Sequence, residues 1–330
     1  MTRLRARMPS RRQVLGAVVS LGAPLRAAAQ PSWPARPVTV IVPLQPGSAS
    51  DAAVRIVLEV MEVELGQSFA VKNVLGEAGR VGASLAARAA PDGHTLAALN
   101  NAIMTVLPSG ASPTPFDPQR DFVPVGGIAT IPTFLGVHAS VPARTVPEFI
   151  AWARTRGGVA TYASGGLGSP QHLATELFMV LADVTLRHVS YRGATEAAAE
   201  LARGAVDSMF ISQTLLLPHL GSGTIRLIGF GGARRSPAFP DVPTLAEQGV
   251  AGYDYASWIA LFAPAATPEP ILAALRAALR RALARPGVAE RLARSGNEIW
   301  PVEAAALAAT IRSDAARWRA VMRRTAITLY

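Results

Sequence analysis

Two segments of the sequence have the residue types of anion-binding turns. The first covers residues 43–51 (PLQPGSASD), and the second covers residues 164–172 (SGGLGSPQH). Their small residues would allow backbone N–H groups to approach a ligand closely, and their serines could add hydroxyl donors. Where such a turn leads into a helix, the positive end of that helix also favours a bound carboxylate or phosphate. Both segments are therefore candidate sites for an acidic ligand.

Each candidate turn also has a simpler interpretation. The first could be an ordinary strand-to-helix connection in which Asp51 caps the helix, and the second could be a plain loop. The second turn lacks the G-x-G-x-x-G spacing of a dinucleotide site and the G-x-S-x-G of a serine hydrolase. The first lacks the Gly-Lys-Ser/Thr ending of a P-loop. Anion binding through the backbone is the specific hypothesis for both.

Apolar periodicity predicts the strands and helices that must position these turns. Short apolar runs predict strands at residues 38–42, 69–72, 95–99, 134–137, 160–163, 187–189, 208–211 and 225–230. Helical spacing predicts helices at residues 51–65, 82–90, 146–154, 171–181, 195–203, 268–284, 288–295 and 301–322. Gly66 has the place of a helix-ending glycine, and Thr145 and Ser169 have the place of N-caps. Each candidate turn would then join a strand to a helix.

This alternation of strands and helices predicts an α/β fold with parallel sheets and crossover helices. We expect two lobes, with crossings near residues 125–132 and 258–264, because both segments are rich in Gly, Ala or Pro, as hinges often are. Lobe 1 would comprise residues 30–130 plus 258–330, and lobe 2 would comprise residues 131–257. Ligands of open α/β sheets sit beyond the carboxyl ends of strands, so the two turns would face each other across a cleft.

The other residue types exclude several classes of chemistry. The chain has no cysteine, which excludes disulfides, thiolate metal sites and a cysteine nucleophile. We expect structural or surface roles for the histidines, none of which has metal-site spacing: His94, His138, His172, His188 and His219. Ser169 and His172 alone suggest a hydrolase, but their spacing at a helix start does not give the usual geometry. We expect no catalysis, no cofactor and no metal.

Residues 1–29 have the layout of an export signal. Several arginines precede a short apolar run at residues 14–25, and small residues precede the predicted cleavage between Ala29 and Gln30. A transmembrane anchor is the alternative, although the run falls short of the about 20 residues that span a bilayer. Arg11 and Arg12 approximate a twin-arginine signal, so both the Sec and the Tat route stay open. We expect a periplasmic protein.

The formal net charge of +10 overstates the basic character of the mature protein. The predicted signal contains six arginines and no acid, which leaves 26 basic and 22 acidic residues. A balance of +4 does not favour nucleic acid as a partner. No second apolar run of membrane length follows, so we expect the mature protein to be soluble.

A series of short motifs occurs in order along the chain. They are residues 37–43 (PVTVIVP), 46–47 (PG) with Asp51 and Arg55, 65–67 (LGQ), 91–96 (PDGHTL), 117–118 (DP), 121–122 (DF), 124–125 (PV), 164–166 (SGG) to 172–173 (HL), 188–193 (HVSYRG), 240–244 (PDVPT), and Trp258 with 261–264 (LFAP). From about Trp33 to Ala326, this ordered set resembles the periplasmic solute-binding proteins of tripartite tricarboxylate transporters, often called Bug-type receptors. Each motif alone is weak, but their order is specific.

The resemblance implies a two-lobed fold of the type II periplasmic-binding-protein kind, a Venus flytrap with a ligand cleft between the lobes. It implies a receptor that captures a small carboxylate and delivers it to the permease subunits of a tripartite transporter. The expected ligand-binding residues are Leu44, Gln45, Gly47, Ser48, Ala49, Ser50, Asn100, Ser164, Gly166, Gly168, Ser169, Tyr191, Gly193 and Ile211. Arg192 could pair with an acidic ligand or lie in solvent. We expect a monomer.

The chain departs from the family pattern at three positions. Members usually have Tyr at the position of His94, often have a second glycine at that of Ser48, and in many cases have Asp at that of Ile211. An Asp that faces the ligand could bind an amino group. We therefore expect Ile211 to disfavour amino acids and to favour an apolar or purely acidic ligand. A sensory receptor that presents its ligand to a signalling partner is the alternative use of the same binding activity.

Overall fold

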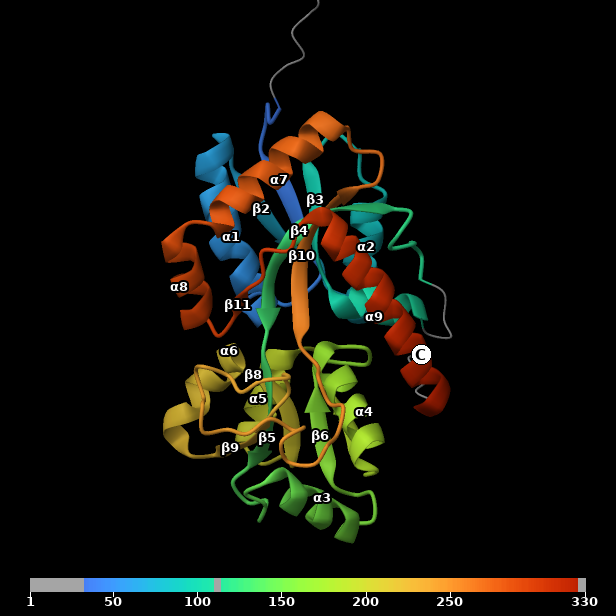
Figure 1. The fold of residues 1–330 in the computed structure, drawn as a ribbon, viewed down its shortest axis with the longest axis vertical. Coiled ribbons are helices and arrows are strands. Elements are labelled where there is room, and N and C mark those ends of the chain that lie inside the picture. Colours follow the sequence, from blue (N-terminus) through green and yellow to red (C-terminus); the bar gives the residue numbers. More distant parts are fainter. Residues whose placement is uncertain (1–32, 110–113, 326–330) are drawn as a thin grey trace, which may run out of the picture. The chain divides into compact units, whose positions relative to one another are not determined.

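The computed structural model describes residues 33–109 and 114–325, which form two β-sheets flanked by helices (Figure 1). The first sheet has the strand order β11-β4-β10-β3-β1-β2. Its strands are β1 (Val38–Val42), β2 (Phe69–Asn73), β3 (Thr95–Asn100), β4 (Phe122–Ile131), β10 (Ser257–Pro264) and β11 (Glu298–Ile299). The second sheet has the order β7-β6-β8-β5-β9. Its strands are β5 (Thr133–His138), β6 (Thr161–Ser164), β7 (Arg187–Ser190), β8 (Ser208–Ser212) and β9 (Ile225–Phe230).

Each sheet is mixed. β1 pairs in parallel with β2 and β3, and β6 pairs in parallel with β7 and β8, as the alternation of elements predicts. β10 is antiparallel to β3 and β4, and β5 is antiparallel to β8 and β9. The prediction of parallel sheets is therefore wrong for these strands. The chain leaves the first sheet along β4 and returns along β10, so neighbouring strands run in opposite directions.

The two segments predicted as crossings are regular strands. Residues 125–131 belong to β4 and residues 258–264 belong to β10, and only Pro132 separates β4 from β5. The small residues of β4 serve packing: a Cβ on Gly127 would come within 2.6 Å of the Trp300 side chain. A composition that resembles a hinge therefore belongs here to a strand that other elements approach closely.

Alternate side chains of the first sheet face two helical layers. Val40 and Leu261 pack in one buried cluster with α1, α7 and α8. Their neighbours Ile41 and Phe262 pack in a second cluster with α2, η2 and α9. These helices are α1 (Ala49–Leu65), α2 (Arg80–Ala87), α7 (Glu269–Leu283), α8 (Pro286–Arg294), α9 (Ala304–Thr325) and the π-helical turn η2 (Ala102–Val106).

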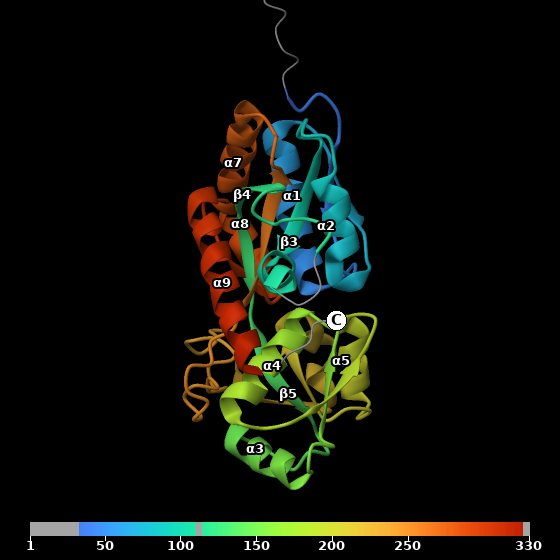
Figure 2. The ribbon, with the colours of Figure 1, turned by 90° about the vertical axis from the view of Figure 1, so that its right-hand side faces the viewer.

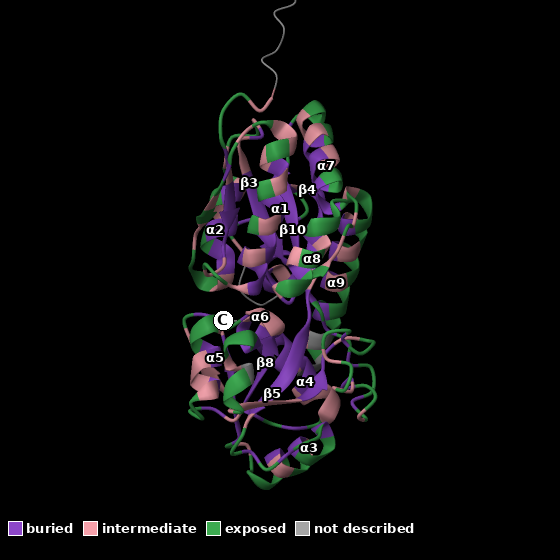
Figure 3. Ribbon diagram, turned by 90° about the vertical axis from the view of Figure 1, so that its left-hand side faces the viewer, coloured by how far each residue is buried: buried purple, intermediate pink, exposed green. Residues whose placement is uncertain are grey.

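The second sheet has its own buried core. Tyr162, Phe178 and Phe210 lie within it, and Figure 3 shows the buried strands of both sheets beneath helices with exposed outer faces. Its helices are α3 (Val146–Thr155), α4 (Pro170–Ala182), α5 (Ala194–Ala202) and α6 (Gln213–Leu216). Shorter 3-10 turns are η1 (Glu77–Gly79), η3 (Leu107–Ser109) and η4 (Leu217–Ser222).

Local sequence signals set the helix ends as predicted. Gly66 ends α1 in the left-handed conformation, with φ of 66°. Thr145 and Ser169 cap α3 and α4, and the hydroxyl of each accepts a backbone N–H of the first turn. These ends depend on neighbouring residues in the chain, which is why the sequence alone predicts them.

Helix α9 connects the two cores. It begins beside the first sheet, and its Trp318 packs edge-on against Tyr255 in the core of the second sheet, with ring centroids 5.9 Å apart (Figure 1, Figure 2). The division of the chain into residues 30–130 plus 258–330 and residues 131–257 stays a prediction.

The predicted export signal, residues 1–29, lies outside the described residues. Within residues 33–109 and 114–325, no helix is both long enough and apolar enough to span a bilayer.

Candidate ligand-binding site

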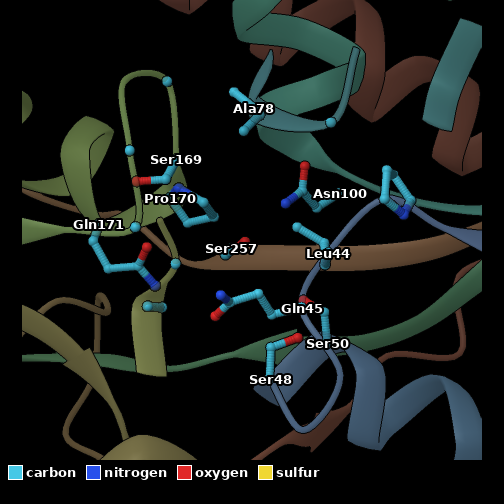
Figure 4. A pocket seen from close by; sticks show the side chains of 18 of the residues that line it. Leu44, Gln45, Ser48, Ser50, Ala78, Asn100, Ser169, Pro170, Gln171 and Ser257 are labelled. Atoms are coloured by element: carbon cyan, nitrogen blue, oxygen red, sulfur yellow. The ribbon is translucent and has the colours of Figure 1, made fainter. Parts of the chain in front are cut away.

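A cavity of about 400 Å³ lies where segments of both sheets meet. This volume is within the range of small-molecule sites. Figure 4 shows Ser169, Pro170 and Gln171 on one side of it and Leu44, Gln45, Ser48 and Ser50 on the other. The two turns singled out in the sequence therefore face each other across one cavity.

The first turn joins β1 to α1. Ser48 is the N-cap, and its hydroxyl accepts the backbone N–H of Asp51 at 3.3 Å. Ala49 and Ser50 form the start of the helix and line the cavity. Their backbone N–H groups donate no hydrogen bond within the described residues, as expected for the first turn of a helix. The turn thus presents unpaired donors to the cavity.

Asp51 braces this turn from behind. Its carboxylate, 3% exposed, accepts hydrogen bonds from Gly47 N–H at 2.9 Å, Arg55 Nε at 2.9 Å and Asn73 Nδ2 at 2.9 Å. Burial raises the pKa of Asp51, but the hydrogen bonds from Arg55, Asn73 and Gly47 outweigh it and leave this pKa below its usual value. The simpler interpretation, in which Asp51 caps the helix, is wrong, because the N-cap is Ser48.

The second turn joins β6 to α4 and has a similar construction. Ser169 is the N-cap, and its hydroxyl accepts the backbone N–H of His172 at 3.4 Å. The His172 ring reaches back, and its Nδ1 accepts the N–H of Gly168 at 3.2 Å. The backbone N–H of Gln171, beside the cavity, donates no hydrogen bond within the described part of the chain. Because Ser169 bonds the backbone of His172 and not its ring, the pair does not form a nucleophile–base arrangement.

A buried polar cluster lies behind the second turn. The Tyr162 hydroxyl donates to Glu176 Oε1 at 2.7 Å, and the His172 and His188 rings lie 4.7 Å apart. Ser164 Oγ lies 2.6 Å from His188 Nε2 and bonds the backbone of Gly166.

Burial sets the protonation of this cluster. Burial and the neighbouring His188 lower the pKa of His172 to about 3, and burial also lowers the pKa of His188. Burial raises the pKa of Glu176, although the Tyr162 hydroxyl partly offsets the effect. His172 is therefore neutral at pH 7, which the acceptor role of its Nδ1 requires.

A third turn, between β7 and α5, completes the wall. Gly193 is the N-cap of α5, and no side chain caps this helix. A Cβ on Gly193 would lie 1.9 Å from the Gln45 side chain, so Gln45 of the first turn lies directly against this residue. Gly165 allows a similar approach, because a Cβ there would lie 2.7 Å from Ala194 N. Glycine at both positions lets the three turns close around one space.

Most residues predicted to bind ligand are brought together here. The lining contains Leu44, Gln45, Ser48, Ala49, Ser50, Asn100, Gly166, Gly168, Ser169, Tyr191 and Gly193. Gly47, Ser164 and Ile211 are not part of it; Gly47 donates to Asp51, and Ser164 bonds His188 behind the second turn. Contact with a ligand stays a prediction for the residues that line the cavity.

Ile211 points into an apolar cluster and is fully buried. Side chains alternate along a strand, so its neighbour Ser212 lines the cavity from β8. Ile211 therefore does not face the cavity, and Ser212 is the residue of β8 that we expect to influence the choice of ligand. Sequence reasoning also missed Thr133 of β5 and Ser257 of β10, which line the cavity where the chain passes between the sheets.

The cavity has few charges. Of the residues that the structure describes, Glu77 and Arg192 are the charged residues of its lining, and both are exposed. No cluster of potential metal ligands occurs among the described residues. Trp258 stacks on Trp300, with centroids 5.5 Å apart, and is not part of the lining. The wall can therefore bind an anion mainly through backbone N–H groups, helix ends and hydroxyls.

The chain has two mixed β-sheets flanked by helices, and residues from both halves line one ligand-sized cavity. This architecture defines the class of periplasmic solute-binding proteins with a two-lobed type II-like fold. Residues 53–327 match the tripartite tricarboxylate transporter family receptor, and the chain belongs to this family. The resemblance inferred from the ordered sequence motifs is thereby confirmed.

Individual relatives cover nearly the whole chain. The UPF0065 protein in the tcbD-tcbE intergenic region of Pseudomonas sp. (strain P51) is 36% identical over 313 residues, 94% of this chain and 93% of that protein. The structure of R. palustris Rpa4515 with adipate is 32% identical, with a TM-score of 0.85 over 90% of this chain and 99% of that one. MatC from Rhodopseudomonas palustris with bound malate is 32% identical, with a TM-score of 0.82 over 87% of this chain and 99% of that one.

Proposed function

We propose that this protein is a periplasmic receptor that captures a small organic carboxylate and delivers it to the permease of a tripartite transporter. One observation carries the proposal: the starts of α1 and α4 present unpaired N–H groups to the same cavity from opposite sides. Hydrogen bonds to a charged group contribute about 1.5–3 kcal/mol each, so several of them suffice for micromolar binding without a buried arginine.

Two related structures support the ligand class. Proteins 32% identical to this chain contain adipate in one case and malate in the other. Both ligands are small acids, and the cavity of about 400 Å³ has room for a molecule of that size. In our proposal Ala49, Ser50 and Gln171 donate to the ligand, with the hydroxyls of Ser48 and Ser169 close by.

Capture would use closure of the two lobes. A ligand that contacts both walls binds the closed state more tightly than the open state. The ratio of these two affinities sets how far the ligand shifts the equilibrium toward closure. In our proposal the contact between Gln45 and Gly193 belongs to the closed state. Closure would then distinguish the loaded receptor from the empty one for the permease.

The first test is a thermal-shift screen with small organic acids, including adipate, succinate, malate, lactate and benzoate. A ligand that binds only the native state raises the melting temperature, by an amount that grows with its concentration above Kd. Isothermal titration then measures the affinity of each hit. If no organic acid shifts the transition at millimolar concentration, the proposed function is wrong.

A pair of variants tests the N–H donors directly. Ala49→Pro removes the N–H of the first helical residue, where proline is compatible with the helix and with the extended Ser48 before it. Ala49→Val adds similar bulk but retains the N–H. We expect the proline variant to bind the acid about tenfold more weakly than the valine variant. Equal affinities would exclude this N–H as a ligand donor.

A further inference from the structure

Two buried hydroxyls of the cavity wall have no hydrogen-bond partner. Thr133 opens β5 and is 1% exposed, whereas Ser212 closes β8 and is 2% exposed. Both line the cavity, yet neither Oγ1 of Thr133 nor Oγ of Ser212 is bonded within the described residues. Ser257, the other hydroxyl at this place, differs because it donates to Asn101 Oδ1 at 2.9 Å. Unpaired buried polar groups are uncommon in native proteins and call for an explanation.

Strand register places the hydroxyls of Thr133 and Ser212 next to each other, so that they form one site. Thr133 lies directly opposite Ser212 in the antiparallel β5–β8 pair. Residues opposite each other on one face of such a pair have Cβ atoms about 5 Å apart. A single ligand group between them would reach both hydroxyls.

Ser212 also has no local use for its hydroxyl. It occupies the N-cap position of α6, where serine commonly bonds the helix backbone, but its side chain makes no capping hydrogen bond. The hydroxyl is therefore available to a ligand.

We propose that Thr133 and Ser212 recognise a hydroxyl group of the ligand, so that the protein selects hydroxylated organic acids over their deoxy analogues. This inference rests on the proposed function, since it concerns the same cavity. A ligand hydroxyl both donates and accepts, and so do the side chains of Thr133 and Ser212. The carboxylate of the ligand lies at the helix starts, and its hydroxyl lies at the strand pair.

A carboxylate of the ligand would bind poorly between Thr133 and Ser212. In the part of the chain that the structure describes, the charged residues of the lining are Glu77 and Arg192, both exposed, and neither belongs to β5 or β8. A carboxylate between two neutral hydroxyls would be buried without a countercharge, which is costly. A neutral hydroxyl avoids that cost and pairs both protein groups.

The test measures affinity for matched acids by isothermal titration. The pairs are malate with succinate, lactate with propionate, and 3-hydroxybutyrate with butyrate. We expect the parent protein to bind the hydroxylated member of the best-fitting pair about tenfold or more tightly than its deoxy partner, because the deoxy acid leaves both hydroxyls unpaired. In the double variant Thr133→Val/Ser212→Ala this preference falls to within about twofold.

Ser208→Ala is the matched control. Ser208 is a fully buried serine of the same strand, its Oγ donates to Thr161 O at 3.0 Å, and it is not part of the cavity lining. We expect this variant to lose melting temperature while it keeps the preference for the hydroxylated acid. Ser212→Ala should keep its melting temperature without ligand, because it removes an unpaired group. The two serines of one strand thereby separate a ligand contact from a structural role.

Three outcomes overturn the inference. Equal binding of both members by the parent protein is the first. The second is an equal loss of affinity for the hydroxylated acid and its deoxy partner in the double variant. It would mean that Thr133 and Ser212 bind water and not the hydroxyl of the ligand. The third is a hit such as adipate that binds more tightly than every hydroxylated acid; it leaves the proposed function intact. Only the absence of binding by every acid would contradict the proposed function as well.

Discussion

The turn before α1 and the turn before α4 have the same backbone design and different chemistry behind it. The N-caps Ser48 and Ser169 have φ/ψ of −67°/160° and −67°/158°. Three residues after each cap, a side chain accepts the N–H of the glycine immediately before that cap: Asp51 accepts from Gly47, and His172 accepts from Gly168. Two segments far apart in the sequence thus position N–H donors in one way.

The difference lies in charge. Asp51 is an ionised carboxylate with a guanidinium beside it, whereas His172 is a neutral ring in an aromatic and histidine cluster. A carboxylate acceptor functions over the whole range above its lowered pKa. A ring acceptor functions only while the ring is unprotonated, so the second turn carries the greater pH sensitivity.

The largest expected effect comes from the charged acceptor. Asp51→Ala leaves Gly47 N–H, Arg55 and Asn73 without their shared partner. We expect a loss of about 3 kcal/mol in the free energy of unfolding, measured by urea denaturation. Asp51→Asn, which keeps an acceptor oxygen, should lose less. A loss below about 1 kcal/mol for the alanine variant would mean that the carboxylate does not brace the turn.

His172→Asn should change the response to pH. Below pH 6.5 the unfolded chain takes up a proton at residue 172, which the folded protein does not accept until about pH 3. Stability therefore falls as pH drops through this window, by up to about 1.4 kcal/mol per pH unit. Asparagine still offers an oxygen to Gly168 N–H but takes up no proton.

The measurement is the free energy of unfolding of parent and variant at pH 7, 6, 5 and 4. Glu176 acts in the opposite direction, because a raised folded pKa lowers stability as pH rises above 4.5. Because Glu176 Oε1 lies 3.5 Å from His172 Nε2, parent and variant are compared with Glu176→Gln in both, which removes this contribution. We expect a shallower slope for His172→Asn, and identical slopes would contradict a neutral buried His172.

Gly193→Ala tests how the first turn meets the opposite wall. Its φ of −178° is accessible to alanine, so the expected effect comes only from the collision of the new Cβ with Gln45. We expect about tenfold weaker ligand binding by isothermal titration, since closure is impeded. Gln45→Ala in the same chain should restore part of the affinity. Gly221→Ala, with nothing within 4 Å of its Cβ, is the control.

The smallest effects compare the two caps. Ser48→Ala and Ser169→Ala each remove one hydroxyl that accepts a single backbone N–H. We expect each to lower the free energy of unfolding by about 1 kcal/mol, measured by urea denaturation. Because the cap geometries match, the two losses should agree within about 0.5 kcal/mol. A clear inequality would show that one turn is held mainly by the residue behind it.

The sequence by itself determined the local features of this protein. Apolar periodicity predicted most of the strands and helices, although not β4, β10, β11 or α6, and single residues such as Gly66 and Ser169 predicted where helices end or begin. The turns before α1 and α4 were also visible, because small residues between a strand and a helix form a local pattern. The ordered motifs identified the family, which the match over residues 53–327 confirms.

Only the tertiary structure decided which residues meet. Thr133 and Ser212 are 79 positions apart in the chain and become neighbours through the register of β5 and β8. Gln45 lies against Gly193 for a similar reason, since the two belong to turns of different sheets. No local pattern records either contact, because strand register is set by pairing within the second sheet and the approach of distant turns is set by how the two cores fit together.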